Sequence, residues 1–391
     1  MISHYLKIIL KKSGYGGGAI YIHYEHYTKA NQSHLNISPE LYIYGNVKFE
    51  ENYTYGKGGA IYNSSHYSGH KGIIHFVSGT TTFSGNKSGI AKEFEEVRDS
   101  DGNISYKVVD EVGMYNDIYN AGAIKIYQDA TVILDGGITG TGTIEILSQD
   151  GKSGYMSLNA REEDIDNNRR SDIGIENTVK NNGAININEN VNAIFDEAIT
   201  GSGIVNVNGG TLNGQITGNA VTMNNGTWNL TGDSNVNQIQ GVDFTVTGDK
   251  ALSINSQGAG VEGMGIKGSG NLNVKTLDVK AENNVIQADD SLVVKADEIV
   301  LTAGGKDSNV FQANADLTVE TGKLTVNAED ANRVFRGTNG STTNLSADEI
   351  SVTGQVVDDA AFKVAEDSTL NLTVNKGVIE GNFIVGEDES N

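Results

Sequence analysis

A short glycine-rich step returns along this 391-residue chain and limits the folds that the chain can adopt. It reads GGAI at 17–20 and 58–61, and it returns as GAI at 122–124 and 183–185. Glycine takes positive φ angles at little steric cost, and a small alanine lets the backbone turn close to a neighbouring segment. A phosphate-binding loop would need another glycine spacing at the start of a helix, whereas a strand follows here. We therefore interpret each step as a corner, after which the isoleucine points into a core.

A longer repeat contains two of these steps. Residues 120–146 and 181–207 align without a gap at an offset of 61 residues. In both copies apolar and polar residues alternate, with Gly, Asn or Asp between the alternating pieces, which is typical of short strands joined by tight turns. Chance is a poor explanation, because the alternation agrees along with the identities.

A second rhythm appears after about residue 270. The segments NNVIQ, SNVFQ and NRVFR begin at residues 283, 308 and 332, and strictly alternating segments lie between them. A period of about 24 to 25 residues is typical of solenoid repeats. Leucine-rich repeats need leucine at fixed positions and usually a helical return, and this sequence has neither. Three short strands and three turns fit one coil of a parallel β-helix.

One such coil is not stable alone. The backbone entropy lost by ordering about 24 residues exceeds what a few inward aliphatic side chains return. Coils must therefore stack, share their apolar interiors and hydrogen-bond along the axis. The sequence predicts an all-β fold, namely an elongated β-solenoid and, within that class, a right-handed parallel β-helix.

We expect three regions along the chain. Residues 1–13 are predicted to form an N-terminal cap, with a short helix over residues 1–12 that covers an open end of the fold. Residues 14–231 are predicted to form a β-helix that carries the glycine-rich steps. Residues 232–391 are predicted to continue the solenoid with repeats of about 24 residues.

Two charged segments interrupt the strand rhythm, at about 91–112 and 158–174. We expect loops or hairpins that project from the stack. Loops on a rigid scaffold often carry binding sites. Whether these two bind a ligand or are solvated insertions stays open from the sequence.

Composition excludes several classes of protein. The chain has no cysteine, so disulfides and cysteine-ligated metals are excluded. A formal charge of -22 repels nucleic acid phosphates, so we expect no nucleic acid partner. No stretch approaches the roughly 18 apolar residues of a membrane-spanning helix. Lys7 interrupts the only apolar run near the N-terminus, so that we expect no signal peptide in this chain.

All seven histidines lie in the first fifth of the chain, namely His4, His23, His26, His34, His66, His70 and His75. The spacings HYEH and HYSGH could hold a metal such as zinc, but HExxH is absent. We predict exposed turn histidines, no metal site and no cofactor. Eleven of sixteen tyrosines precede residue 68. They indicate either a face that binds sugars or proteins or the ordinary preference of tyrosine for strands.

Three acidic doublets are candidates for chemistry, namely Asp289-Asp290, Glu329-Asp330 and Asp358-Asp359. We predict that they lie in turns, where aspartate is common. Lyases of the β-helix type pair carboxylates with a basic residue. After residue 231 the only arginines are Arg333 and Arg336, which we also place in a turn. We therefore predict no catalytic residues.

The motifs FEEN at 49–52 and FSGN at 83–86 accompany GGAI in the chain. Together they resemble the paired GGA[I/L/V] and FxxN motifs of chlamydial polymorphic outer membrane proteins, and more broadly the passenger domains of bacterial autotransporters. NDIYN at 116–120 and ITGTGTIEI at 138–146 are also similar to passenger repeats. The motif-bearing resemblance covers about residues 14–231.

The FxxN motif also has a physical interpretation. Phe49 and Phe83 would stack in the core, and Asn52 and Asn86 would sit at turns, where asparagine tolerates left-handed geometry and bonds the backbone. The residues that we single out as structural motif are Gly17, Gly18, Ala19, Ile20, Phe49, Asn52, Gly58, Gly59, Ala60, Ile61, Phe83, Asn86, Gly122, Ile124, Gly183 and Ile185.

The resemblance implies a right-handed parallel β-helix, display on the bacterial cell surface and adhesion as the commonest role. The expected partner is a host-cell or bacterial surface protein or glycan, bound without catalysis by coil faces or projecting loops. Contact with the outer membrane is expected only through a flanking barrel that is absent from this chain. Two alternatives stay open. A carbohydrate-active enzyme, a polysaccharide lyase or hydrolase, would show a cleft of paired carboxylates with a basic partner, and a structural spike or stalk would form stable trimers.

Overall fold

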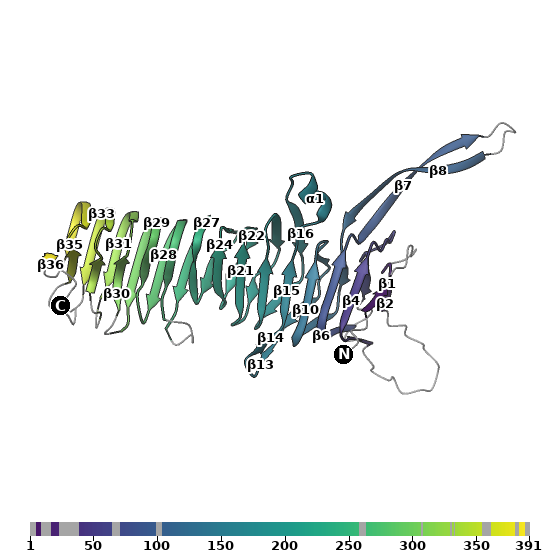
Figure 1. Cartoon of the computed structure of the whole chain (residues 1–391), viewed down its shortest axis with the longest axis horizontal. Helices are drawn as coiled ribbons and strands as arrows, with labels where there is room; N and C mark the ends of the chain where they lie inside the picture. The colour runs from purple at the N-terminus through teal and green to yellow at the C-terminus, as the bar shows by residue number, and fades with distance from the viewer. Residues whose placement is uncertain are drawn as a thin grey trace. The chain divides into compact units, whose positions relative to one another are not determined.

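The structure is a computed structural model of the chain. It describes residues 5–8, 17–22, 39–64, 71–98, 104–257, 263–305, 308–328, 331, 333–353, 361–379 and 383–387. The chain divides into two compact units, Met1–Glu197 and Ala198–Asn391, which are described one at a time. In both units successive coils add parallel strands to the same ladders, so each unit is a β-solenoid (Figure 1). The prediction of an all-β solenoid is therefore confirmed, whereas the handedness of the coil stays a prediction.

Each coil of the first unit contributes to three stacks of parallel strands, here called faces A, B and C. Face A contains β2 (Ile20–Ile22), β5 (Ile61–Asn63), β9 (Ile118–Asn120), β11 (Ile138–Thr139), β16 (Ser171–Ile175) and β19 (Val191–Phe195). Face B contains β3 (Glu40–Ile43), the first halves of β6 (Ile73–Ser84) and β10 (Ala123–Leu134), β12 (Thr143–Ile146) and β17 (Thr178–Asn181). Face C contains β1 (Tyr5–Ile8), β4 (Asn46–Glu50), the second halves of β6 and β10, β15 (Tyr155–Leu158) and β18 (Ala184–Ile187).

The second unit also has three faces, here called D, E and F. Face D contains β21 (Ile204–Asn208), β24 (Ala220–Asn224), the first parts of β27 (Gln238–Asn255), β28 (Ile266–Ala281) and β29 (Ile286–Ala303), then β30 (Asn309–Ala313), β32 (Arg333–Gly337), β34 (Phe362–Ala365) and β36 (Phe383–Glu387). Face E contains β22 (Thr211–Gly214), β25 (Thr227–Leu230), the middle parts of β27 to β29, and the first halves of β31 (Leu317–Asn327), β33 (Thr342–Thr353) and β35 (Thr369–Ile379). Face F contains β20 (Ile199–Thr200), β23 (Ile216–Thr217), β26 (Ser234–Val236) and the last parts of the six long strands β27, β28, β29, β31, β33 and β35.

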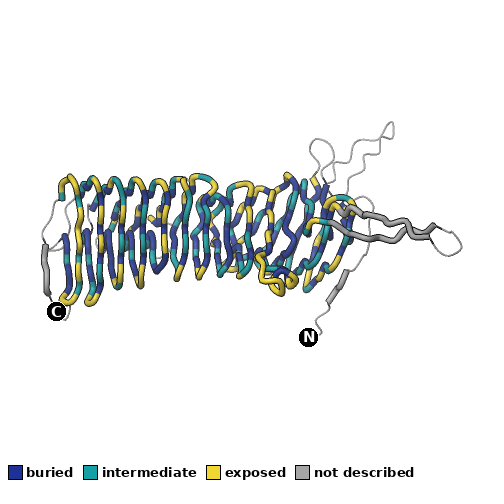
Figure 2. The backbone as a smooth tube through the Cα atoms, turned by 90° about the horizontal axis from the view of Figure 1, so that it is seen from above, coloured by how far each residue is buried: buried dark blue, intermediate teal, exposed yellow. Residues whose placement is uncertain are grey.

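Side chains alternate between the interior and the surface along most strands; β30, which is buried at all five positions, is an exception. Figure 2 shows buried and exposed positions following one another along the strands. In the first unit Phe49 and Phe83 stack with their ring centroids 4.8 Å apart, and Phe76 meets Phe83 edge to face. In the second unit Trp228 is fully buried, and its indole Nε1 donates to the Gly214 carbonyl at 3.0 Å. This period of two produces a continuous apolar core inside each stack.

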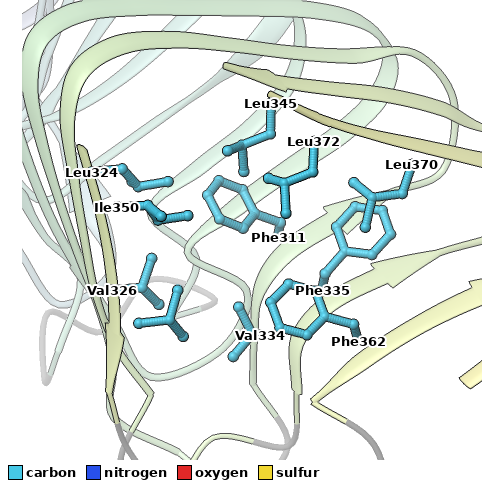
Figure 3. A pocket seen from close by; sticks show the side chains of 11 residues that line it. Phe311, Leu324, Val326, Val334, Phe335, Leu345, Ile350, Phe362, Leu370 and Leu372 are labelled. Atoms are coloured by element: carbon cyan, nitrogen blue, oxygen red, sulfur yellow. The ribbon is translucent and has the colours of Figure 1, made fainter. Parts of the chain in front are cut away.

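The repeat after residue 270 coincides with one coil. Ile286, Phe311 and Phe335 lie in register on face D, and they are 25 and 24 residues apart in the chain. The interior beside Phe311 and Phe335 holds an apolar gap of about 10 Å³ (Figure 3). Such a gap has room for about one water molecule and lacks the polar partners that a water needs. It is a packing gap and not a ligand site.

The 61-residue repeat does not coincide with a whole number of coils. Ile124 lies on face B, in register with Ile144, whereas Ile185 lies on face C, in register with Met156. Relative to the first copy, the second copy therefore lies two coils further along the stack and starts on the next face. Both positions accept this segment because each begins with a glycine in close contact with the neighbouring coil, followed by alanine and an inward isoleucine.

The N-terminal helix predicted for residues 1–12 is wrong for the part that the structure describes. Residues 5–8 form β1, which pairs in parallel with β4 from Tyr5↔Asn46 to Ile8↔Phe49. The free edge of β4 offers backbone hydrogen bonds to an extended segment, and a helix would leave these groups unpaired.

The two predicted insertions have different structures. Strands β7 (Lys87–Arg98) and β8 (Ile104–Tyr115) form an antiparallel hairpin that extends away from the coils of the first unit (Figure 1). The hairpin predicted at about 91–112 is therefore confirmed. The segment predicted at 158–174 is a projecting connection between β15 and β16, and it contains the short helix α1 (Glu162–Asp166), which the sequence did not predict. A small hairpin of β13 (Ser148–Gln149) and β14 (Lys152–Ser153) precedes it.

Candidate functional site

The GGAI steps form a corner before face A. The Gly18 amide donates to the Gly59 carbonyl at 2.8 Å, and the Gly59 amide donates to the Asn116 carbonyl at 2.8 Å. A Cβ atom at Gly18 would lie 2.3 Å from the Gly59 carbonyl oxygen. The second glycine of each step is therefore required by close approach between coils. The first glycine is required by conformation, since Gly17 and Gly58 have φ angles of 60° and 72°.

The remaining residues of these steps also serve the packing of coils. Ala60 and Ile61 are fully buried, whereas Ala19 and Ile20 are half-buried. Cβ atoms at Gly122 and Gly183 would lie 2.1 and 2.3 Å from carbonyl oxygens of Gly72 and Gly154. Ile124 and Ile185 point into the core.

The FxxN asparagines form a buried ladder between coils instead of left-handed turns. Asn52 and Asn86 are both fully buried, and neither has a positive φ angle. The Asn86 side-chain oxygen accepts from the Asn52 side-chain amide at 2.8 Å, and the Asn86 amide donates to the Phe49 carbonyl at 3.0 Å. The preceding residues Glu51 and Gly85 take the left-handed conformation, with φ angles of 52° and 64°. The expected left-handed geometry at both asparagines is wrong, because their amides are needed inside the stack.

The ladder ends on a buried acid. Asp117 stacks on Ala60 of the preceding coil, since the Ala60 amide donates to the Asp117 carbonyl at 3.0 Å. Its carboxyl group is fully buried and accepts from the Asn86 side chain and from the Gly136 amide, both at 2.8 Å. Burial, together with the nearby carboxyl of Asp135, raises the pKa of Asp117 to about 8, while these hydrogen bonds act in the opposite direction. Neither the composition nor the residue spacing of the sequence indicated that Asp117 is buried.

Asp135 lies beside this acid and is also buried. The Gly85 amide donates to both of its carboxyl oxygens, at 3.2 and 3.1 Å. Burial raises the pKa of Asp135 to about 6, while the Gly85 hydrogen bond and the charge of Arg161 act in the opposite direction.

The segment at 158–174 projects from the coils, as Figure 1 shows for α1, but two of its side chains, Arg161 and Asp164, turn inward toward these acids. Arg161 is buried, donates from Nε to Asp164 at 2.8 Å and donates from a terminal nitrogen to the Asp135 carbonyl at 2.8 Å. Its guanidinium lies over the Tyr115 ring, 4.3 Å from the centroid. Burial, followed by a hydrogen bond with Glu163, raises the pKa of Tyr115. These contacts stabilise the fold at the base of the hairpin and place the carboxylates below the surface.

An exposed aromatic cluster lies on face B. Tyr44 and Tyr42 are 62% and 50% exposed, and their ring centroids are 6.5 Å apart. Tyr42 stacks on His75 of the next coil at 4.3 Å, and His75 Nδ1 lies 3.1 Å from the Tyr127 hydroxyl of the coil beyond. The Tyr42 hydroxyl donates to Glu40, whose carboxylate is 3.7 Å from His75 Nε2. We call these five residues the aromatic surface.

The position of His75 corrects the prediction of exposed turn histidines. It lies in β6 and is only 6% exposed, because Tyr42 covers one face of the ring and Tyr127 lies near the other. Burial lowers the pKa of His75, with the Glu40 charge opposing this effect. The other six histidines lie outside the described residues.

Face A carries a second row of tyrosines. Tyr21, Tyr62 and Tyr119 stack on one another with centroids 4.9 and 5.0 Å apart, and the Lys57 ammonium lies 4.5 Å from the centre of the Tyr119 ring. Rings stacked along the axis occupy one another's faces, so the row offers mainly edges and hydroxyl groups to a ligand. This row therefore stabilises neighbouring coils. Tyr21 is 48% exposed, nearly as much as Tyr42, and Tyr44 has the largest exposed fraction of these rings.

The acidic doublets and arginines of the second unit do not assemble into a catalytic group. Asp289 and Asp290 lie within β29, where its pairing with β28 changes register, and Asp289 accepts from Asn314 at 2.9 Å. Arg333 and Arg336 lie in β32 and not in a turn. The other two doublets lie outside the described residues. Within the described part of the chain, no group of three His, Asp or Glu side chains is placed to hold a metal.

Comparison with known protein families, curated proteins and solved structures found no match for this chain. Among the described residues, no helix has the length and apolar character needed to span a bilayer.

Proposed function

We propose that the chain is a passenger-type adhesin displayed on the surface of a bacterial cell, and that it binds its ligand without catalysis. The binding site is the aromatic surface of the first unit, and the ligand is a protein or glycan of a host or neighbouring cell. The GGAI and FxxN motifs support the class, because they resemble those of passenger domains and lie at the corners and in the core of a β-solenoid.

The observation that carries the proposed site is the exposure of Tyr42 and Tyr44 on an otherwise polar strand face. Tyrosine combines a large apolar ring with a polar hydroxyl, and it loses little conformational entropy on binding. The stack of Tyr42 on His75 and the hydrogen bond from Tyr42 to Glu40 hold one ring in place. A pre-positioned ring reduces the entropic cost of binding.

Two experiments test this proposal. Binding of the purified chain to host cells and to a glycan array is compared between the wild type, Tyr44→Ser and Tyr155→Ser, where Tyr155 is a matched control, 42% exposed on face C. We expect Tyr44→Ser to lose binding and Tyr155→Ser to keep it; equal binding by the two variants would exclude the aromatic surface as the site.

Surface display is tested separately by protease treatment of intact source cells, probed with an antibody to residues 91–112. Loss of the signal without lysis supports display outside the cell. A protected signal contradicts the adhesin proposal and directs attention to glycan cleavage assays and to the trimers expected of a stalk.

A further inference from the structure

A groove with threonine and asparagine side chains along it crosses three coils of face E in the second unit. Its first part is a hollow of about 440 Å³, and its second part is a hollow of about 320 Å³; Thr247 and Asn273 line both parts. The lining residues stand in register, with Thr245 beside Asn271 and Val293, and Thr247 beside Asn273 and Lys295. Asp249, Lys275 and Asp297 complete the second part. We propose that this groove binds a neutral oligosaccharide.

The asparagines of the groove differ from other outward asparagines of the same face. Asn213 and Asn229 hydrogen-bond each other at 2.8 Å, and Asn344 and Asn371 do so at 2.9 Å. Asn271 and Asn273 have no amide beside them in the ladder, and neither side chain hydrogen-bonds to another residue that the structure describes. Their amide groups are available to a ligand.

The backbone at the groove is held by glycines. Gly248 and Gly270 have φ angles of 154° and 140°, at the two ends of the groove-lining parts of β27 and β28. Cβ atoms there would lie 2.9 and 2.2 Å from carbonyl oxygens of Leu230 and Phe244. The pairing of β27 with β28 also changes register after Gly248. The glycine conformations and the register change that shape the groove therefore belong to the strands of the coil, and the groove does not depend on a mobile loop.

The chemistry of the lining favours a sugar. Hydroxyl and amide groups recur at the spacing of neighbouring strands, about 4.8 Å, and at two residues along each strand, which is about 7 Å. Such a grid offers donors and acceptors to successive hydroxyl groups. Each hollow has the size of a small-molecule site, for which about 300–1,000 Å³ is typical.

The charges of the groove select against acidic sugars. Lys295 is paired with Glu320 at 2.6 Å, and this pair leaves Lys275 as the cation beside Asp249 and Asp297. A uronate or a phosphate would be repelled by the excess carboxylate. A neutral chain of hexoses or N-acetylhexosamines meets no such repulsion.

The experiment uses the full chain and saturation-transfer difference NMR with cellohexaose, maltohexaose and chitohexaose as neutral probes and hexagalacturonate as the acidic probe. We expect at least one neutral probe to bind, and Asn273→Leu to weaken its binding about tenfold, since a lost hydrogen bond in a site has this magnitude. Asn371→Leu is the matched control, because Asn371 is an exposed asparagine of the same face outside the groove. Thr247→Val provides a second, smaller change in case Asn273→Leu affects folding.

The outcomes separate this inference from the proposed function. Binding that is weakened by Asn273→Leu or Thr247→Val but not by Asn371→Leu or Tyr44→Ser supports the groove. Binding lost only in Tyr44→Ser places the sugar on the aromatic surface and overturns the groove. The absence of binding by every neutral probe, or tighter binding of hexagalacturonate, also overturns it.

Discussion

The side-chain amide of Asn86 donates a 2.8 Å hydrogen bond to the fully buried carboxyl group of Asp117, one coil further along the first unit. The same side chain bonds Asn52 in the preceding coil. One asparagine therefore connects three coils inside the stack. Amide side chains can do this because they donate and accept at once.

Replacement of this asparagine is expected to weaken the first unit strongly. Asn86→Leu leaves the buried donors of Asn52 and the buried carboxyl of Asp117 without their partner, which costs about 2–5 kcal/mol of unfolding free energy. Asn224→Leu is the control, because Asn224 is exposed and bonds Asn208 at the surface. Urea unfolding followed by circular dichroism measures both. Similar unfolding midpoints would mean that the buried ladder contributes little.

The glycine corner leads to a second prediction. A Cβ atom at Gly59 would lie 2.5 Å from the Asn116 carbonyl oxygen and 2.6 Å from the Lys87 amide nitrogen, both in the backbone. Gly59→Val should therefore destabilise the chain by about 3 kcal/mol, because the coils must separate locally. At Gly174 a Cβ atom meets nothing within 4 Å, so that Gly174→Val should be tolerated. Thermal melting distinguishes the two, and equal melting temperatures would contradict the requirement for close approach.

The raised pKa of Asp117 predicts how stability depends on pH. Between about pH 4 and pH 8 the unfolded chain has released a proton that the folded chain still holds, so the free energy of unfolding falls as the pH rises. Asp117→Asn has no such proton and should show a smaller fall between pH 5 and pH 8. Asp150→Asn, at an exposed turn, should keep the slope of the wild type. Melting temperatures at both pH values provide the comparison, and an unchanged slope in Asp117→Asn would contradict the prediction.

The lowered pKa of His75 predicts that stability depends on pH in the opposite direction at lower pH. Its pKa is lowered in the folded chain, so below about pH 6.5 the unfolded chain binds a proton that the folded chain does not, and stability falls as the pH falls. His75→Phe keeps a ring against Tyr42 and should reduce the loss of melting temperature between pH 7 and pH 5. Tyr155→Phe serves as the control. A loss as large in His75→Phe as in the wild type would show that another group is responsible.

The sequence predicted the solenoid well because its signals are local. Alternation with a period of two, glycine corners and a 25-residue rhythm each report on a few neighbouring residues. Ile286, Phe311 and Phe335 illustrate this, since their spacing in the chain equals one coil. The helix expected over residues 1–12 is wrong at β1. Pairing with the free edge of β4 satisfies the backbone hydrogen bonds of residues 5–8, and the helical pattern of the sequence there is weak.

The candidate sites were harder to predict from the sequence than the fold. The tyrosine-rich N-terminal region was visible, but the pattern did not tell which rings stack on one another and which stay exposed. Asp117 resembles any surface aspartate in the sequence, and its burial follows from its place above Ala60. The groove of the second unit depends on the register of neighbouring coils. This register places Asn271 between Thr245 and Val293, and Asn273 between Thr247 and Lys295.

The sequence by itself determined the class of fold, the length of a coil in the second unit and the residues that must be glycine at the corners. The tertiary structure alone decided the register, and with it the face on which each side chain lies. Ile124 and Ile185 occupy equivalent places in the 61-residue repeat and yet lie on different faces. The physical reason is that inward alternation is set within a strand, whereas the neighbours of a side chain are set by the number of residues in every intervening turn.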